Sequence, residues 1–277
     1  MFKLNRKEAE RLNIWDKKAI QISIKNLKDK IRHWQYVFFS LLLPIMFTVM
    51  FYFMFGSEKD PTGRTNFDYG FPGMIMYAIG MGTMNAAIMF AQDKSSGMLD
   101  RLDTMPTGRK NMFLGALISE SIFLMIQILI MFFIGYVLLG LYFEGPIELF
   151  IGFLIAVVFG ISSVGLGITI ASVSKNVEIA NAASLLVFMV LIFLSGSMVP
   201  FESPIVFFTP PFWAKQLYLQ LTVLGDGFGD LLYNGSLIGI SSETIPITLG
   251  IGLFIVFAYT IVFILLGIIV FQKKTKF

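Results

Sequence analysis

The sequence predicts an all-α integral membrane protein with six transmembrane helices, and three observations support this prediction. Hydrophobic residues make up 56% of the chain and charged residues 14%, whereas soluble domains are roughly 45–50% apolar. Eighteen of the 21 Lys and Arg residues fall on one side of the resulting topology, which places both termini in the cytoplasm of a multi-pass cell-membrane protein. Six stretches reach the roughly 20 apolar residues that a bilayer requires: Tyr36–Phe55, Phe71–Ala91, Ile118–Tyr142, Ile147–Val173, Ile179–Val199 and Ile247–Phe271.

Residues 1–35 are predicted to form a cytoplasmic tail and an amphipathic interfacial helix, ahead of a single transmembrane domain at residues 36–277. Apolar side chains recur at helical spacing on one face, and lysines fill the other faces, as in helices that lie in the membrane interface. The alternative is a surface helix on a soluble core, but the chain offers no such core. The apolar face comprises Ile20, Ile24, Leu27, Ile31 and Trp34.

A charged island of 24 residues, 92–115, separates the second and third apolar stretches. It must lie in water while both of its ends are held at the bilayer, and its four basic residues mark it as cytoplasmic. A loop held in this way is well placed to receive a push from a soluble partner. This favours a transport machine with a separate motor.

The longest segment outside the spans runs from residue 200 to 246 and is unusually apolar for a loop. Prolines at Pro210-Pro211 and three nearby glycines interrupt it. Irregular backbone at membrane depth needs cover from protein or water. We expect short helices that dip partly into the outer leaflet, and an amphipathic cap on the membrane surface is the alternative.

The composition predicts no catalytic residues, no metal site and no cofactor bound by this chain. Cysteine is absent, His33 is the single histidine, and no phosphate-binding G-x-x-x-x-G-K-[ST] loop occurs. Within the spans, Glu120 is the clearest ionisable residue, and such residues are costly there unless paired. It either pairs with a basic residue of the charged loop or a neighbouring helix, or lies near the lipid headgroups.

Four side chains are candidates for a substrate path, namely Asn85, Gln127, Met46 and Met50. The two amides could hydrogen-bond a substrate, although bonding between helices is their commoner use. The methionines belong to a flexible thioether stripe that suits varied apolar ligands, although packing or lipid contact is the commoner use of such a stripe. A separate stripe of small residues favours close helix packing and comprises Ser163, Gly167 and Ala171.

Four segments of the chain form a pattern that can be compared with known families. A basic helix leads into a span with an early proline, IKNLKDKIRHWQYVFFSLLLP, the second span opens with Pro72-Gly73, and the fifth span ends in LSGSMVPFES. The charged loop reads Asp93-Lys94, Gly97-Met98, Leu99-Asp100-Arg101-Leu102, Pro106, Arg109, Leu114-Gly115. In these segments the chain resembles the permease subunits of type-2 ATP-binding-cassette exporters, particularly the drug-resistance and polysaccharide-export branch. The loop is the most specific match, although it departs from the family at Gln92, Met98 and Ala116.

The resemblance implies a half-transporter that exports amphiphilic drugs, lipids or lipid-linked glycans. Its partners would be a nucleotide-binding ATPase subunit that carries ATP and Mg²⁺, a second permease subunit (identical or not) and membrane lipids, with no nucleic acid. An ion-coupled secondary transporter and a non-transporting assembly or immunity protein are the alternatives. A cytoplasmic coupling helix in the loop would dock on the ATPase through Ser96, Gly97, Leu99, Asp100, Arg101, Leu102, Met105 and Pro106.

Overall fold

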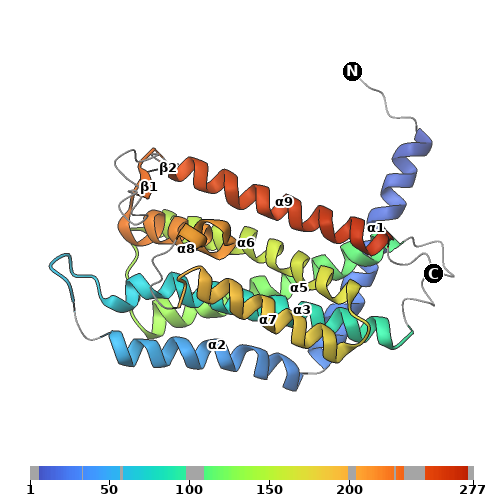
Figure 1. Cartoon of the computed structure of the whole chain (residues 1–277), viewed down its shortest axis with the longest axis horizontal. Helices are drawn as coiled ribbons and strands as arrows, with labels where there is room; N and C mark the ends of the chain where they lie inside the picture. Colours follow the sequence, from blue (N-terminus) through green and yellow to red (C-terminus); the bar gives the residue numbers. More distant parts are fainter. Residues whose placement is uncertain are drawn as a thin grey trace.

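The computed structural model describes residues 6–32, 34–56, 59–97, 109–198, 204–227, 229–233 and 247–273. Within these residues six helices are long and apolar enough to cross a membrane, which confirms the predicted architecture of a multi-pass membrane protein. The N-terminal helix and the end of the last helix lie at the same end of the bundle (Figure 1). This end is called the termini side below, and the opposite end the far side. The spans are Phe38–Phe55, Asn66–Ser95, Asn111–Leu138, Pro146–Val173, Val177–Leu194 and Leu249–Phe271.

The described helices follow one another as α1 (Arg6–Arg32), α2 (Trp34–Phe55), α3 (Asn66–Ser95), α5 (Arg109–Phe133), α6 (Pro146–Val173), α7 (Val177–Leu194), α8 (Pro210–Tyr218) and α9 (Leu249–Lys273). Shorter elements are the π-helical turns η1 (Ile134–Leu138) and η3 (Leu219–Leu224) and the 3-10 turn η2 (Pro204–Phe208). Strands β1 (Leu231–Tyr233) and β2 (Ile247–Thr248) pair antiparallel, with an irregularity within β1. The sequence analysis did not predict this short pair.

Helix α3 is the axis of the bundle. In the most apolar stretch of α3, 72% of the residues are buried, against 11% in α9. It packs against α6 and α7, and α6 in turn packs against α9. Glycines permit the close approach, since a Cβ at Gly80 would lie 2.1 Å from the Phe188 ring and one at Gly73 would lie 1.8 Å from the Ser197 carbonyl oxygen. Packing through small residues is the usual means of helix association in membranes.

The predicted start of the second span, Phe71, was wrong for the helix, which begins five residues earlier at Asn66. Thr65 and Asp68 form a capping box there, in which each side chain accepts a hydrogen bond from the other residue's backbone N–H. Such a box satisfies two of the free donors at a helix start. Likewise α5 begins at Arg109 rather than at Ile118, since an apolar run marks only the part of a helix in hydrocarbon.

Two predicted ends were also placed too late. The third helix ends at Leu138 instead of Tyr142, and the fifth at Leu194 instead of Val199. Both are followed within two residues by a glycine with positive φ, Gly140 at 66° and Gly196 at 65°. Glycine adopts this left-handed conformation without the steric cost that other residues meet, and it commonly ends helices.

The short helices expected between residues 200 and 246 are present in the described part of that segment as η2, α8 and η3. They pack into the bundle on the far side, where Trp213, Leu217 and Tyr218 are buried. The Trp213 ring N–H donates to the Phe207 carbonyl at 2.8 Å, which fixes η2 against α8. Their depth in the membrane stays a prediction.

Candidate functional site: the α1–α5 clasp and the far-side cluster

Helix α1 packs on α5 through a stripe of small and polar residues. These residues are spaced by four, three and four positions, so they share one helix face, and all are less than 10% exposed: Ala19, Ser23, Asn26 and Lys30. Gly115 of α5 admits the contact, because a Cβ there would lie 2.8 Å from the Ile22 side chain. The close approach positions a charged side chain of α1 directly over α5.

A buried ion pair closes this contact. The Lys30 ammonium donates to Glu120 Oε2 at 2.6 Å, and the two side chains are 1% and 6% exposed. The ammonium also lies 4.0 Å from the centre of the Phe123 ring, an arrangement that favours a cation. Of the two roles expected for Glu120, the structure therefore shows the first, with the basic partner on a neighbouring helix. We call this contact, with the stripe above, the α1–α5 clasp.

A small polar hollow lies beside the clasp, between α1, α3 and α5. Its lining includes Asn26, Asp93 and Glu120. Just beyond it, Lys94 of α3 donates to the backbone carbonyls of Ser172 and Ser174, at 3.1 and 2.8 Å. The ends of α3 and α6 and the clasp therefore meet on the termini side.

The predicted coupling residues start at this point. Ser96 ends α3, and its hydroxyl donates to the Asp93 carbonyl at 3.0 Å; Gly97 follows with a φ of 69°. The other predicted coupling residues lie outside the described residues, namely Leu99, Asp100, Arg101, Leu102, Met105 and Pro106. Their role stays a prediction.

The apolar stripe predicted for the interfacial helix points away from the bundle. Ile20, Ile24 and Ile31 are 50%, 47% and 73% exposed, and Leu27 is half-buried. Trp34, predicted on the same helix, is instead the first residue of α2. Helix α1 thus buries its polar stripe and exposes its apolar one.

The four candidate substrate-path residues do not come together. Asn85 and Gln127 are buried, and the Gln127 amide donates to the Ala78 carbonyl at 3.3 Å, a bond between α5 and α3. Met46 and Met50 are 60% and 45% exposed on α2 and face away from the interior. Sequence periodicity could not separate these positions, because lipid-facing and interior positions of a membrane helix are both apolar.

The stripe of small residues on α6 lies against α3. Gly167 is the closest point, since a Cβ there would lie 2.2 Å from the Thr83 carbonyl oxygen. Ala171 is fully buried one turn away, and Ser163 lines an apolar cavity between α3, α6 and α7. The stripe therefore lies at a helix contact within the chain.

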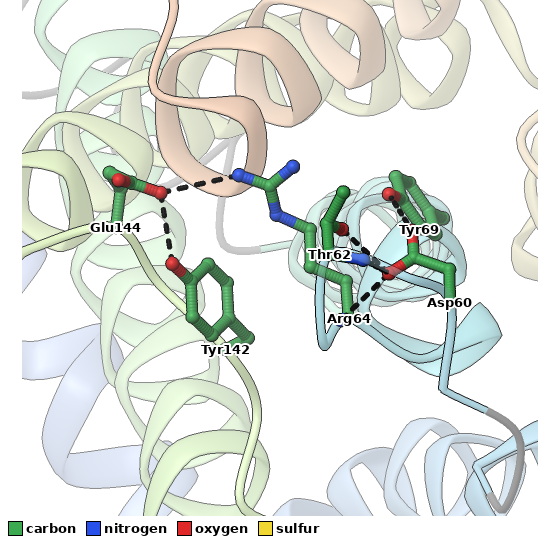
Figure 2. Close-up of polar contacts among 6 residues, drawn as sticks. All are labelled: Asp60, Thr62, Arg64, Tyr69, Tyr142 and Glu144. Carbon is green, nitrogen blue, oxygen red and sulfur yellow. Dashed lines mark hydrogen bonds and ion pairs between the residues drawn. The ribbon is translucent and has the colours of Figure 1, made fainter.

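On the far side, a polar cluster joins the segment before α3 to the segment before α6, as Figure 2 shows. Arg64 donates to Glu144 Oε2 at 3.2 Å and lies over the Tyr142 ring, and the Tyr142 hydroxyl donates to the same carboxylate oxygen at 3.0 Å. The bond to Glu144 raises the pKa of Tyr142. Sequence analysis missed this pairing, because Arg64 and Glu144 stand 80 residues apart with no pattern that links them.

Asp60 organises the first half of this cluster. Its carboxylate accepts hydrogen bonds from the hydroxyls of Thr62 and Tyr69 at 2.6 and 2.8 Å, and also from the backbone N–H groups of Thr62 and Arg64. The Thr62 bond and then the Tyr69 bond lower the pKa of Asp60 to about 2, because they favour the ionised form. These bonds hold the first loop together, and the Arg64–Glu144 pair ties it to the second loop.

The described residues contain no group of three or more His, Asp or Glu side chains placed to hold a metal ion. His33, the single histidine, lies outside them. Of the functional residues now visible, Lys30 was the one for which the sequence held a weak signal, although it did not identify Lys30 as the partner of Glu120. The only signal was its register with Ala19, Ser23 and Asn26, within a segment that carries ten basic residues.

These features define a six-helix membrane protein with an N-terminal helix clasped to its third span, next to a charged loop. A family model described as "ABC-2 type transporter" matches residues 19–219, which is more than half of the 277 residues, and the chain belongs to this family. It is also similar to the daunorubicin resistance ABC transporter permease protein DrrB1 of Streptomyces coeruleorubidus, with 25% identity over 178 residues. That match covers 64% of this chain and 60% of the relative's length.

Proposed function

We propose that the chain is the membrane-spanning permease subunit of an ATP-driven exporter. Membership of the ABC-2 type transporter family and the six helices support this role. The excess of Lys and Arg on the termini side supports a cytoplasmic location for both termini in the cell membrane. ATP and Mg²⁺ would be bound by a separate ATPase subunit, and a second permease subunit, identical or not, would complete the pathway.

The observation that carries the proposal is the α1–α5 clasp. Helix α5 begins at Arg109, within the charged segment 92–115, and the Lys30–Glu120 pair fastens it to α1 at 2.6 Å. A force applied by an ATPase to the loop or to α1 would therefore reach the same transmembrane helix. Breaking a buried pair is costly, because one charge is then left uncompensated, so the two elements should move as one body.

The substrates in this proposal are amphiphilic drugs, lipids or lipid-linked glycans. Support comes from the similarity to a permease named for daunorubicin resistance. Since this relative is matched over only part of its length, its drug is not assigned to this chain. The test below therefore uses a panel of amphiphiles of differing charge.

The experiment is to co-purify the chain with the ATPase encoded beside it and to measure ATP hydrolysis in lipid nanodiscs with that panel. We expect stable capture and a hydrolysis rate that responds to at least one amphiphile. The double charge reversal Asp100→Arg with Arg101→Asp should abolish the response while leaving membrane insertion intact. The control is the double reversal Lys59→Asp with Asp226→Lys on the far side, which should retain the response.

Failure of a well-folded preparation to capture any ATPase would favour the motorless alternatives. Capture with a normal response in the loop double mutant would instead refute the docking role of the loop alone. The two outcomes separate the exporter proposal from the assignment of its coupling element.

A further inference from the structure

The apolar cavity between α3, α6 and α7 is also lined by the start of α8 and by one residue of α9. It contains about 380 Å³ of space free of protein atoms, including the part that opens outward. Its apolar lining includes Phe188 and Leu191 of α7 and Phe263 of α9. Thr83 and Ser163 are the polar side chains in the lining, and the Thr83 hydroxyl already donates to its own helix. A hydrocarbon chain suits such a lining better than water does.

The N-terminal turn of α8 closes the cavity toward the far side through Pro210 and Pro211. One turn further along the same face of α8 stands Lys215. Its ammonium donates to the Gly196 carbonyl at 2.6 Å, beyond the end of α7. Ile192 of α7, which also lines the cavity, lies four residues before Gly196. Both helices therefore place Lys215 one turn beyond the apolar lining.

Lys215 is half-buried, and no carboxylate of the described residues lies within 4.0 Å of its ammonium. The other described cations of the far side are arranged differently: Arg64 pairs with Glu144, and Lys59 is exposed to solvent. A partly desolvated cation with only a carbonyl partner is unfavourable, and an anion at that position would offset the cost. The Ser195 and Ser197 hydroxyls, bonded to each other at 2.7 Å, flank Gly196 and add polar groups there.

We propose that this cavity and Lys215 form a binding site for an anionic amphiphile taken from the bilayer. The hydrocarbon chain would enter the cavity beside α7, and the phosphate, sulfate or carboxylate headgroup would pair with Lys215. As a substrate site it rests on the proposed exporter function and narrows the substrate class to anionic amphiphiles. As a binding site it does not depend on an ATPase.

The test measures binding to the full chain, without ATPase, in phosphatidylcholine nanodiscs. The probes are a short-chain fluorescent phosphatidylglycerol and the phosphatidylcholine with identical chains and label. We expect the wild-type protein to bind the anionic probe about tenfold more tightly, as one charge-assisted contact allows. Lys215→Gln should remove this preference and Lys215→Arg should retain it. Lys59→Gln, which removes the same charge from the same side but outside the cavity, should leave it unchanged.

A second variant probes the apolar part independently and guards against misfolding of the first. Leu191→Trp narrows the cavity at a partly exposed wall position and should weaken both probes equally, leaving the preference for the anion intact. Equal affinity of the wild-type protein for the two probes would overturn the proposal. So would an undiminished preference in Lys215→Gln, or unchanged binding in Leu191→Trp. Loss of ATPase capture with intact probe binding would refute the exporter function while leaving this site in place.

Discussion

Removing either partner of the buried Lys30–Glu120 pair should open the α1–α5 clasp. Replacing both partners with apolar residues should leave the clasp closed. Replacing Glu120 with Leu removes the carboxylate paired with Lys30, whose side chain is 1% exposed, and leaves its ammonium against the Phe123 ring at 4.0 Å. Breaking a buried pair in this way costs about 3–5 kcal/mol, whereas an apolar pair of similar volume is often neutral. We take the lower value of this cost, about 3 kcal/mol, because the clasp lies near the end of the bundle. This corresponds to roughly a 100-fold rise in the local opening equilibrium of α1.

The assay exploits the absence of cysteine from the chain. A single Ser23→Cys substitution places a thiol in the clasp, where the native side chain is 2% exposed. Its rate of maleimide labelling then reports how often α1 lifts from α5. We expect Glu120→Leu to raise this rate roughly 100-fold, and Lys30→Met with Glu120→Leu to restore it to within about threefold of the parent.

Lys28→Met is the matched control, because it removes the same charge from an exposed position of the same helix. It should change the labelling rate by less than about threefold, as expected of exposed charges. An unchanged rate in Glu120→Leu would refute the energetic role assigned to the pair. A double variant that labels as fast as Glu120→Leu would show that the loss of packing, and not the unpaired charge, opens the clasp.

Three further predictions concern packing, topology and pH. Gly73→Ala places a Cβ 1.8 Å from the backbone oxygen of Ser197, just after α7, and should lower thermal stability by at least about 2 kcal/mol, whereas Gly70→Ala, with open space around it, should be neutral or stabilising. In intact cells an impermeant maleimide should label Asn66→Cys on the far side, and Ser95→Cys only after permeabilisation; the reverse pattern would invert the topology. Because its folded-state pKa is lowered from 3.8 to about 2, Asp60 should stabilise its loop fully above pH 3.8 and lose this effect as the pH falls through 2. Hydrogen exchange of the two backbone amides that donate to it, corrected for intrinsic rates, should therefore show protection at pH 4 but not below pH 2, and its loss at pH 4 would contradict the assignment.

The number of spans was predictable because the bilayer itself fixes it. A helix must supply about 20 apolar residues to cross, so composition alone identifies six such segments. The helix ends were less predictable, since helices continue into water wherever caps allow. Helix α3 begins at the Thr65–Asp68 capping box, and α7 ends before Gly196. Capping chemistry, and not hydrophobicity, sets these boundaries.

The two faces of helix α1 were not equally predictable. The apolar stripe through Ile20, Ile24 and Ile31 was visible, because periodicity reports any sustained one-sided pattern. The partner of Glu120 could not be identified from the sequence, because Lys30 is separated from it by 90 residues and is one of ten basic residues in its segment. Only the three-dimensional register of α1 on α5 selects it. Pairing across a bundle is tertiary information, which a local pattern does not contain.

The orientation of α1 reverses that of a helix on a soluble protein. Its small and polar stripe faces α5, while its isoleucines face outward. In water this arrangement would expose an apolar surface and bury a charge, both at a cost. If α1 lies in the membrane interface, as the sequence predicts, both costs fall, because lipid would cover the isoleucines and the Lys30–Glu120 pair neutralises the charge. A helix seated in this way can shift along the membrane surface without exposing apolar area to water. The contact of α1 with α5 is specific, whereas contacts of its outer face with lipid would be interchangeable. A force on α1 would therefore move α5.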